Sequence, residues 1–121
     1  GGQQNDTIEG GSGDDSLFGG QDQDVLLGDR GNDFMSGDRG NDKLTGGDGV
    51  DTFRFRVGDG ADVITDFTVG TDKLSFSAGE TPVSSSQLTI GILDGNTTIG
   101  LNNELLVTLI GVSSVSATDF A

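Results

Sequence analysis

The sequence predicts an all-β fold in which very short strands coil and stack in parallel, and two observations support that prediction. A nine-residue pattern is repeated six times without interruption between Gly1 and Arg54. In each copy, turn-forming Gly, Asn, Asp and Gln residues precede a three-residue segment with one large apolar side chain at its centre. A fixed short period indicates a repeating architecture, so each copy is interpreted as one turn followed by one strand.

Three positions of the repeat are invariant in character. The first position is always Gly, and the eighth is always a large apolar residue: Ile8, Leu17, Leu26, Met35, Leu44 or Phe53. The sixth position is always Asp, as Asp6, Asp15, Asp24, Asp33, Asp42 and Asp51. Because side chains alternate along a strand, the eighth position is expected to face the interior and the seventh and ninth positions the outside.

The aspartates of the sixth position predict metal sites. Each turn reverses the chain, so copy n is expected to stack on copy n+2, about 4.8 Å away. Two carboxylates at about 5 Å repel by roughly 3 kcal/mol at an effective dielectric of about 20, and a Ca²⁺ ion with oxygen ligands at about 2.4 Å fits between them. The expected pairs are Asp6 with Asp24, Asp15 with Asp33, Asp24 with Asp42, and Asp33 with Asp51.

Backbone carbonyls of the turns are expected to complete each ion's coordination. The candidates are the carbonyls of Gly2, Gly11, Gly13, Gly20, Asp29, Gly31, Asp38, Gly40, Gly47 and Gly49. Glycine suits these positions because it accepts a positive φ. Asp29 and Asp38 replace the second Gly and tolerate that conformation, whereas Gln4 and Asp22 replace the fourth Gly and mark the weakest turns.

The copies match GGxGxDxUx and therefore resemble the nonapeptide of RTX (hemolysin-type calcium-binding) proteins. This resemblance implies a right-handed parallel β-roll with Ca²⁺ between stacked turns. The runs DTFRF, GDGADVITDF and GTDKLSF resemble the segment that closes the roll in serralysin-type secreted proteins. The final VTLIGVSSVSATDFA resembles the C-terminal end of many RTX proteins, where an uncleaved type I secretion signal lies.

Three regions are predicted: six repeats over 1–54, degenerate repeats closing the roll over 55–76, and a C-terminal β cap over 77–121. In the second region Asp62 and Asp72 fall near the repeat register, and they either complete further metal sites or only accept hydrogen bonds from turn amides. Asp66 is expected to be structural. In the third region we expect a loop over Ser77–Ser86 and then an antiparallel meander that covers the open end of the roll.

Composition excludes several functions. Twenty acidic residues against six basic ones give a formal charge of −14, which disfavours binding to nucleic acids and anionic membranes. The chain has no His and no Cys, which removes the common catalytic triads and thiolate metal sites, and no apolar run is long enough to span a bilayer. We therefore expect a non-catalytic module, possessing no membrane span.

Charged residues outside the sixth position are expected to have minor roles. Asp14, Asp22, Asp29, Asp38, Asp48 and Asp59 are expected on the surface, where they raise the local Ca²⁺ concentration. Arg30 and Arg39 are expected to relieve the charge of the acidic array. Phe18, Phe34, Val25 and Leu27 point outward and either form a contact surface or are covered by the cap or an upstream segment.

A calcium-dependent folding switch is the predicted function. The repeats bury too little apolar surface to offset their ordering entropy and their carboxylate repulsion, so they are expected to fold only on binding Ca²⁺. The resemblance implies type I secretion from a Gram-negative cell, folding outside it, and an upstream cargo domain. The alternative is an adhesive or polysaccharide-binding scaffold at the cell surface, although the outward positions show no regular rank of one residue type.

Overall fold

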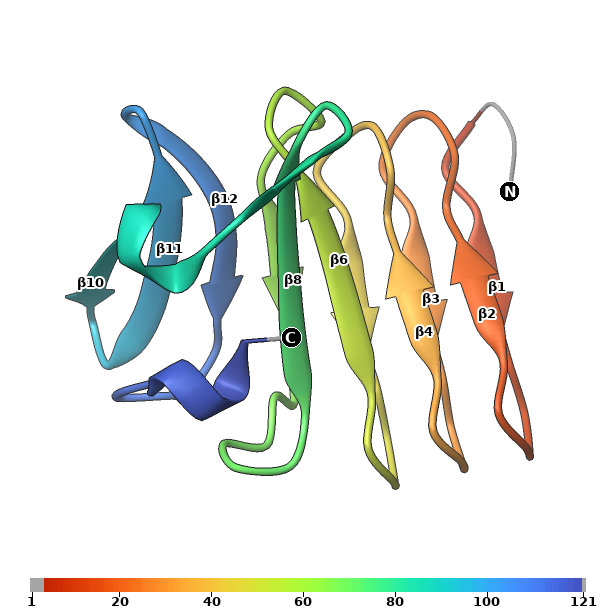
Figure 1. The fold of residues 1–121 in the computed structure, drawn as a ribbon. Coiled ribbons are helices and arrows are strands. Elements are labelled where there is room, and N and C mark those ends of the chain that lie inside the picture. The colour runs from red at the N-terminus through yellow and green to blue at the C-terminus, as the bar shows by residue number, and fades with distance from the viewer. Residues whose placement is uncertain (1–3, 121) are drawn as a thin grey trace.

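The structure, a computed structural model, describes residues 4–120. It consists of two sheets that face each other, with seven strands in one and five in the other. The chain crosses from one sheet to the other at each turn, so successive repeats alternate between the sheets (Figure 1). Among the described residues, no helix is long and apolar enough to cross a membrane.

The repeat strands form two interleaved parallel stacks. The larger sheet begins with β1 (Thr7–Glu9), β3 (Val25–Leu27) and β5 (Lys43–Thr45). The smaller sheet begins with β2 (Ser16–Phe18), β4 (Phe34–Ser36) and β6 (Thr52–Arg56). Strand n pairs with strand n+2, as in the register of Ile8 with Leu26. The predicted parallel β-roll is therefore confirmed.

The eighth position of each repeat forms the core between the sheets. Leu26, Met35, Leu44 and Phe53 are fully buried, whereas Ile8 of the first repeat is only partly buried. The strands β2, β3 and β5 each contribute one such side chain, because the residues on either side of it face outward. In the equivalent strand of the fourth repeat the flanking Ser36 is buried as well. The core of the repeats is thus a single row of apolar side chains per sheet.

The degenerate segment continues both stacks. The strand β7 (Asp62–Ile64) lies parallel to β5, with Ile64 opposite Leu44, and β8 (Lys73–Ala78) lies parallel to β6. Between these strands the ring of Phe67 packs 6.3 Å from that of Phe53. The spacing between stacked residues grows from 18 to 20 in this segment, as between Leu44 and Ile64, without loss of the parallel register.

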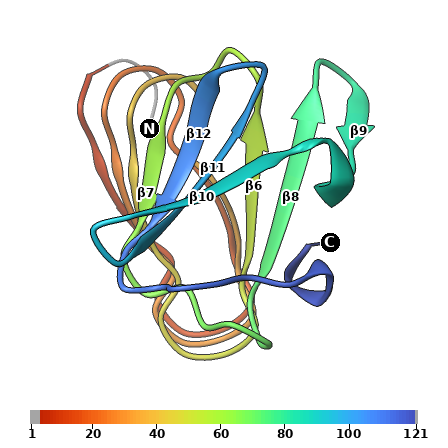
Figure 2. The ribbon, with the colours of Figure 1, turned by 90° about the vertical axis from the view of Figure 1, so that its left-hand side faces the viewer.

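The C-terminal meander continues the larger sheet at the end of the roll. It comprises β10 (Thr89–Leu93), β11 (Asn96–Leu101) and β12 (Glu104–Leu109), which pair antiparallel in sequence order. The strand β12 also pairs parallel with β7, so Leu109 lies opposite Ile64. Figure 2 shows the meander at the end of the roll, where β12 closes the edge of β7.

The prediction of a loop over Ser77–Ser86 is wrong in part. The strand β8 continues to Ala78, Gly79 has a φ of 63°, and the chain returns as β9 (Thr81–Val83), antiparallel to β8. A 3-10 turn, η1 (Ser85–Gln87), follows. Phe76 and Val83 form an apolar cross-strand pair that stabilises this hairpin. The Gly, Pro and Ser residues of the segment indicated a loop, so the sequence did not reveal the hairpin.

The C-terminal tail docks beside β8. A 3-10 turn, η2 (Ala117–Asp119), places the carboxylate of Asp119 in a fully buried position, where it accepts hydrogen bonds from the N–H groups of Gly70 (2.7 Å) and Ser116 (2.8 Å). The ring of Phe120 packs 5.9 Å from that of Phe76. The tripeptide Thr-Asp-Phe occurs here and at residues 65–67, and in both places its Asp binds turn amides while its Phe packs on another Phe.

Candidate metal centre

The sixth-position aspartates form a hydrogen-bonded ladder along each stack. In every case Oδ1 of the later Asp accepts a hydrogen bond from the backbone N–H of the earlier Asp. The four bonds run from Asp6 to Asp24 (2.7 Å), Asp15 to Asp33 (2.9 Å), Asp24 to Asp42 (2.8 Å) and Asp33 to Asp51 (3.0 Å). The structure therefore brings together the four aspartate pairs that the sequence predicted, through a bond from the backbone of one residue to the carboxylate of the other.

The second oxygen of each of these carboxylates is buried and lacks a hydrogen-bond partner among the described residues. These atoms are Oδ2 of Asp6, Asp15, Asp24, Asp33, Asp42 and Asp51. Buried polar atoms are nearly always satisfied, and an unpaired buried carboxylate oxygen is especially unfavourable. Six such atoms at one repeat position indicate a cation as the missing partner.

A second oxygen lies close to these atoms, beside the first-position glycines. A Cβ added to Gly28 would lie 2.5 Å from Oδ2 of Asp33 and 2.6 Å from the carbonyl oxygen of Gly46. A Cβ on Gly19 would lie 2.8 Å from Oδ2 of Asp24 and 2.5 Å from the carbonyl oxygen of Gly37. Carboxylate and carbonyl oxygens are the ligands that Ca²⁺ prefers, so the donor set fits this ion.

Carboxylates alone do not make these sites. Within residues 4–120, no three His, Cys, Asp or Glu side chains cluster closely enough to hold a metal by themselves. Each site must therefore take part of its coordination from the backbone, which the sequence also led us to expect. The first-position carbonyls near Asp Oδ2, such as those of Gly37 and Gly46, were not among the predicted donors.

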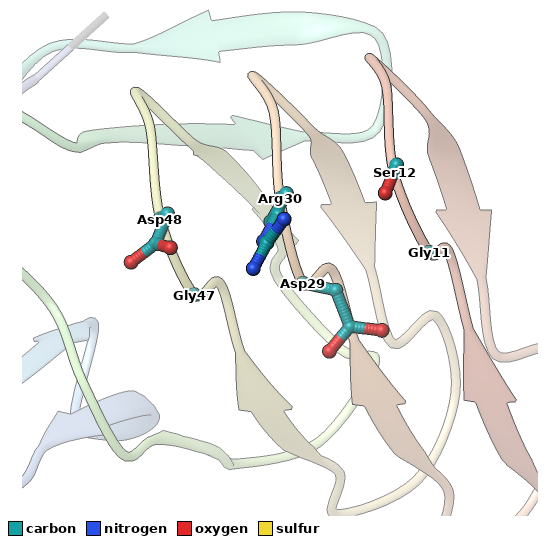
Figure 3. Close-up of a pocket in the computed structure, with 6 residues that line it drawn as sticks. All are labelled: Gly11, Ser12, Asp29, Arg30, Gly47 and Asp48. Atoms are coloured by element: carbon teal, nitrogen blue, oxygen red, sulfur yellow. The ribbon is translucent and has the colours of Figure 1, made fainter.

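Several of the predicted carbonyl donors accept hydrogen bonds between turns instead. The carbonyl oxygens of Gly11, Gly20 and Asp29 accept the N–H groups of Arg30 (3.2 Å), Arg39 (2.9 Å) and Asp48 (2.9 Å). Figure 3 shows how Gly11, Asp29 and Gly47 follow one another in successive turns, with Arg30 between Ser12 and Asp48. A carbonyl oxygen has two lone pairs, so these bonds still permit metal coordination.

The fourth-position carbonyls lie against the next turn of the same stack. The carbonyl oxygens of Gly13, Gly31 and Gly40 come so close to Gly31, Gly49 and Gly60, respectively, that a Cβ at the second glycine would collide with them. Asp38 and Gly47, at the second position, have φ of 64° and 84°, and Gly49, at the fourth, has a φ of 98°. Gly2 lies outside the described residues.

The turns with replaced glycines keep the same backbone conformation. Gln4 and Asp22, at the fourth position, have φ of 96° and 77°, and Asp29 and Asp38, at the second, have φ of 70° and 64°. Asp and Gln thus adopt the left-handed region that glycine adopts in the other copies, at a cost of about 1 kcal/mol each. The turns predicted to be weakest are therefore strained, but their backbone conformation is the same as that of the other turns.

The aspartates of the degenerate segment use their oxygens differently. Oδ1 of Asp62 accepts the N–H of Asp42 (2.9 Å), which continues the ladder. Asp72 accepts the N–H groups of Asp51 (3.0 Å) and Thr68 (2.9 Å) on separate oxygens, so turn amides occupy both of its oxygens. Asp66 accepts Gly46 (2.9 Å) and Gly47 (2.8 Å) in the same way, which is the structural role expected for it.

Burial raises the pKa of the inner aspartates. It raises the pKa of Asp51 to about 6, opposed by the amide of Asp33 and reinforced by the charges of Asp72 and Asp33. Burial likewise raises the pKa of Asp42 to about 6 and that of Asp62 to about 8. Neighbouring aspartates in a stack thus oppose each other's ionisation, as the spacing predicted.

A second ladder, not foreseen from the sequence, runs through the fifth position. Here Oδ1 of the earlier residue accepts the N–H of the later one: Asn5 from Gln23 (3.0 Å), Asp14 from Asn32 (2.7 Å), Asn32 from Val50 (2.8 Å) and Asn41 from Ala61 (2.9 Å). The two ladders run in opposite directions, so adjacent turns clamp each other reciprocally. The recurrence of Asn or Asp at the fifth position of four copies was the available signal.

The remaining charged residues depart from expectation in part: Asp29 and Asp48 are exposed as expected, whereas Asp38 and Asp59 are half-buried. Asp14 and Asp22 are exposed but bind turn amides, since Oδ2 of Asp22 accepts the N–H of Gln4 (2.7 Å). Among the described residues, Arg54 and Arg56 form ion pairs, with Asp38 at 3.5 and 3.7 Å, whereas Arg30 and Arg39 form none. Local charge relief therefore comes from different arginines than the sequence suggested.

Comparisons with solved structures place this geometry among bacterial repeat modules. The chain is similar to the AlgE6R3 subunit of the mannuronan C5-epimerase of Azotobacter vinelandii, with a TM-score of 0.73 and 28% identity over 97% of this chain and 77% of that one. It is also similar to AlgE6R2 of the same enzyme, with a TM-score of 0.62 and 28% identity over 97% and 91% of the two chains. No sequence in a search of curated proteins matches.

A third similar structure belongs to a much longer chain. The extracellular lipase LipA from Serratia marcescens has a TM-score of 0.57 and 28% identity over 95% of this chain and 20% of that one.

A family model for the RTX calcium-binding nonapeptide repeat (4 copies) matches residues 1–35 and 27–64, more than half of the chain. With its ladder of aspartates and its parallel β-roll, this chain belongs to the family of RTX calcium-binding repeat proteins.

Proposed function

We propose that this chain is a module that folds when its turns bind Ca²⁺. The observation behind this proposal is the set of six buried Oδ2 atoms without a hydrogen-bond partner, one from each sixth-position Asp. Leaving a buried charged group unpaired costs several kcal/mol, and here the cost recurs at every turn of the roll. The thin core cannot offset it, so metal binding and folding are a single event.

The residues of the chain would hold and orient the ions in distinct ways. The Oδ2 atoms and the first-position carbonyls supply oxygen donors, while the amide bonds to Oδ1 fix the carboxylate orientation. The fifth-position ladder holds successive turns in register without using these oxygens. Bound Ca²⁺ supplies the positive charge that neutralises neighbouring carboxylates.

The module would serve as the folding switch of a secreted protein, with a cargo domain upstream. RTX membership supports type I secretion, in which the chain leaves a Gram-negative cell unfolded and folds in extracellular calcium. The similarity to 20% of an extracellular lipase supports a module joined to a larger enzyme or toxin. The module itself is a structural calcium-binding domain, and its acidic residues are accounted for by metal and amide contacts.

A calcium titration followed by circular dichroism tests this proposal. At pH 8, strand signal is expected to appear only as free Ca²⁺ rises and to vanish on addition of a chelator. Titration with Mg²⁺ is the control, because that smaller ion demands rigid octahedral coordination and should not induce folding. An identical strand signal with and without chelator would refute the switch.

A second candidate function is binding of an anionic polysaccharide, and one surface cluster favours it. The rings of Phe18 and Phe34 lie 5.9 Å apart, and the guanidinium of Arg54 is 5.8 and 5.6 Å from their centroids. An aromatic surface beside a cation can contact a sugar ring and its carboxylate. The similar R modules belong to an enzyme named for mannuronan.

Binding of uronate oligomers at saturating Ca²⁺ tests this second candidate. Arg54→Ala is expected to weaken binding about tenfold or more, whereas Arg30→Ala, which removes the same charge from another face, should leave it unchanged. Absence of binding by the unmodified chain would rule the candidate out and leave the folding switch untouched.

A further inference from the structure

We infer that β10 is a docking edge on which a second copy of this chain adds its own β10. In Figure 1, β10 is the outermost strand of the larger sheet, next to β11 alone. Its outer backbone groups have no strand partner among residues 4–120. An unpaired edge of this kind is a template for another strand.

The side chains of β10 support docking, because they are apolar and exposed. Ile90, Ile92 and Leu93 have exposed fractions of 43%, 63% and 64%. In the register with β11, Ile90 lies opposite Ile99 and Ile92 opposite Thr97, and both of those partners are fully buried. Ile90 and Ile92 thus continue the core face of the sheet past the last covered strand.

The edge of the smaller sheet that is formed by β9 lacks these properties. The strand β9, which ends the smaller sheet, has only three residues, and one of them is Pro82, which has no N–H to donate. Natural edge strands are commonly blocked by such a proline, by a charged side chain or by their shortness. The strand β10 has five residues, with no proline and no charge. The fold therefore protects one edge and leaves the other available.

Charge favours a second copy of this chain as the occupant. Residues 81–118 contain two charged side chains, Asp94 and Glu104, whereas residues 1–76 contain 16 acidic and 6 basic ones. A basic partner would be attracted to the more strongly charged roll, not to this weakly acidic end, where β10 itself carries no charge. Two copies joined at β10 would hold their acidic rolls at opposite ends and so minimise repulsion.

The sequence of β10 is also complementary to itself. Antiparallel pairing about Gly91 sets Ile90 of one copy opposite the partner's Ile92, so apolar residues meet on one face of a continuous sheet. The contact is isologous, and it closes at two copies. A pair of five-residue strands buries less than the roughly 1,600 Å² of a typical stable interface, so the dimer should be weak and depend on concentration.

Sedimentation velocity in saturating Ca²⁺, over a range of protein concentrations, tests the inference. The unmodified chain is expected to show a monomer–dimer equilibrium. Ile92→Lys should weaken dimerisation at least about tenfold, and Val69→Lys, a matched change at an apolar residue that is 49% exposed and far from this edge in the sequence, should not. Calcium-dependent strand signal confirms that each variant folds.

A cross-link provides a readout that does not depend on the folding of Ile92→Lys. The chain contains no cysteine, so Gly91→Cys introduces a single thiol at the centre of the proposed pairing. On oxidation it should form an intermolecular disulfide far faster than Val69→Cys. A chain that stays monomeric at all concentrations, a dimer that Ile92→Lys leaves intact, or equal cross-linking at positions 91 and 69 would overturn the inference.

Discussion

The backbone N–H of Asp33 donates a 3.0 Å hydrogen bond to Oδ1 of Asp51, while Oδ2 of Asp51 is buried without a hydrogen-bond partner in the described part of the chain. One oxygen of this carboxylate thus fixes its orientation, and the other remains for a metal ion. The same division recurs along both stacks. The orientation of this carboxylate and its coordination of a metal ion can therefore be separated by mutation.

Asp51→Asn should weaken calcium-induced folding while preserving the ladder bond. The asparagine oxygen can still accept the N–H of Asp33, but the charge and the second carboxylate oxygen are lost. We expect the Ca²⁺ concentration at the folding midpoint to rise about tenfold or more, measured by circular dichroism. Asp48→Asn removes an equal charge from an exposed position and is the control. Equal shifts for both variants would indicate general acidity, not a site.

Gly28→Ala should block a metal site without requiring a left-handed backbone conformation. The new Cβ would lie 2.5 Å from Oδ2 of Asp33 and 2.6 Å from the carbonyl oxygen of Gly46. Gly11→Ala is the matched control, because Gly11 has a φ of 82° but open space around the position of a Cβ, so this variant suffers strain of about 1 kcal/mol alone. Calorimetry is expected to show fewer Ca²⁺ ions bound for Gly28→Ala and an unchanged number for Gly11→Ala. Unchanged stoichiometry in both variants would contradict the proposed site.

The repeat region was predictable because one periodic signal determines strand, turn and core together. The nine-residue spacing led directly to the pairing of copy n with copy n+2, to the inward Leu26 and Leu44, and to the aspartate pairs. No long-range information was needed, since each turn contacts only its neighbours in the stack.

Features that depend on tertiary contacts were not predictable. The hairpin of β8 and β9 forms where Phe76 meets Val83, and the position of β12 depends on its parallel pairing with β7, far away in the sequence. The fifth-position ladder was missed because Asn and Asp in a turn are ordinarily explained by turn formation alone. The first-position carbonyls were missed because glycine there suggested backbone freedom, and its role is close approach of oxygens.

Asn41→Ala should lower the stability of the calcium-bound roll without removing a metal ligand. Oδ1 of Asn41 accepts the N–H of Ala61 at 2.9 Å, and its loss is expected to cost about 1 kcal/mol. The measurable signature is faster hydrogen exchange at Ala61 with an unchanged number of bound Ca²⁺ ions. Gln21→Ala, an exposed third-position change, is the control. Loss of a bound ion in Asn41→Ala would show that the two ladders are not independent.

Asp119→Ala should release the C-terminal tail and leave the repeats intact. The Asp119 carboxylate is fully buried and accepts the N–H groups of Gly70 and Ser116, so its removal leaves two amides without an acceptor. We expect a loss of about 2 kcal/mol in unfolding free energy in Ca²⁺ and faster proteolysis near residue 118, with the Ca²⁺ midpoint nearly unchanged. Asp94→Ala, in an exposed turn, is the control. Protease resistance equal to that of the unmodified chain would contradict this role.

The effect of pH should reverse in sign between the metal-free and the calcium-bound chain. Burial raises the folded-state pKa of Asp42 and Asp51 to about 6 and that of Asp62 to about 8, above the value of about 3.9 in an unfolded chain. The protonated groups therefore stabilise the metal-free roll at low pH, and this stability is lost as pH rises through 6 and then 8.

Calcium-stripped protein should show more strand signal at pH 5 than at pH 8. The Ca²⁺ concentration at the folding midpoint should instead be higher at pH 5, because protons compete with the metal. Asp62→Asn should abolish the part of the metal-free dependence above pH 7, and strand signal that rises with pH in the stripped protein would contradict the whole scheme.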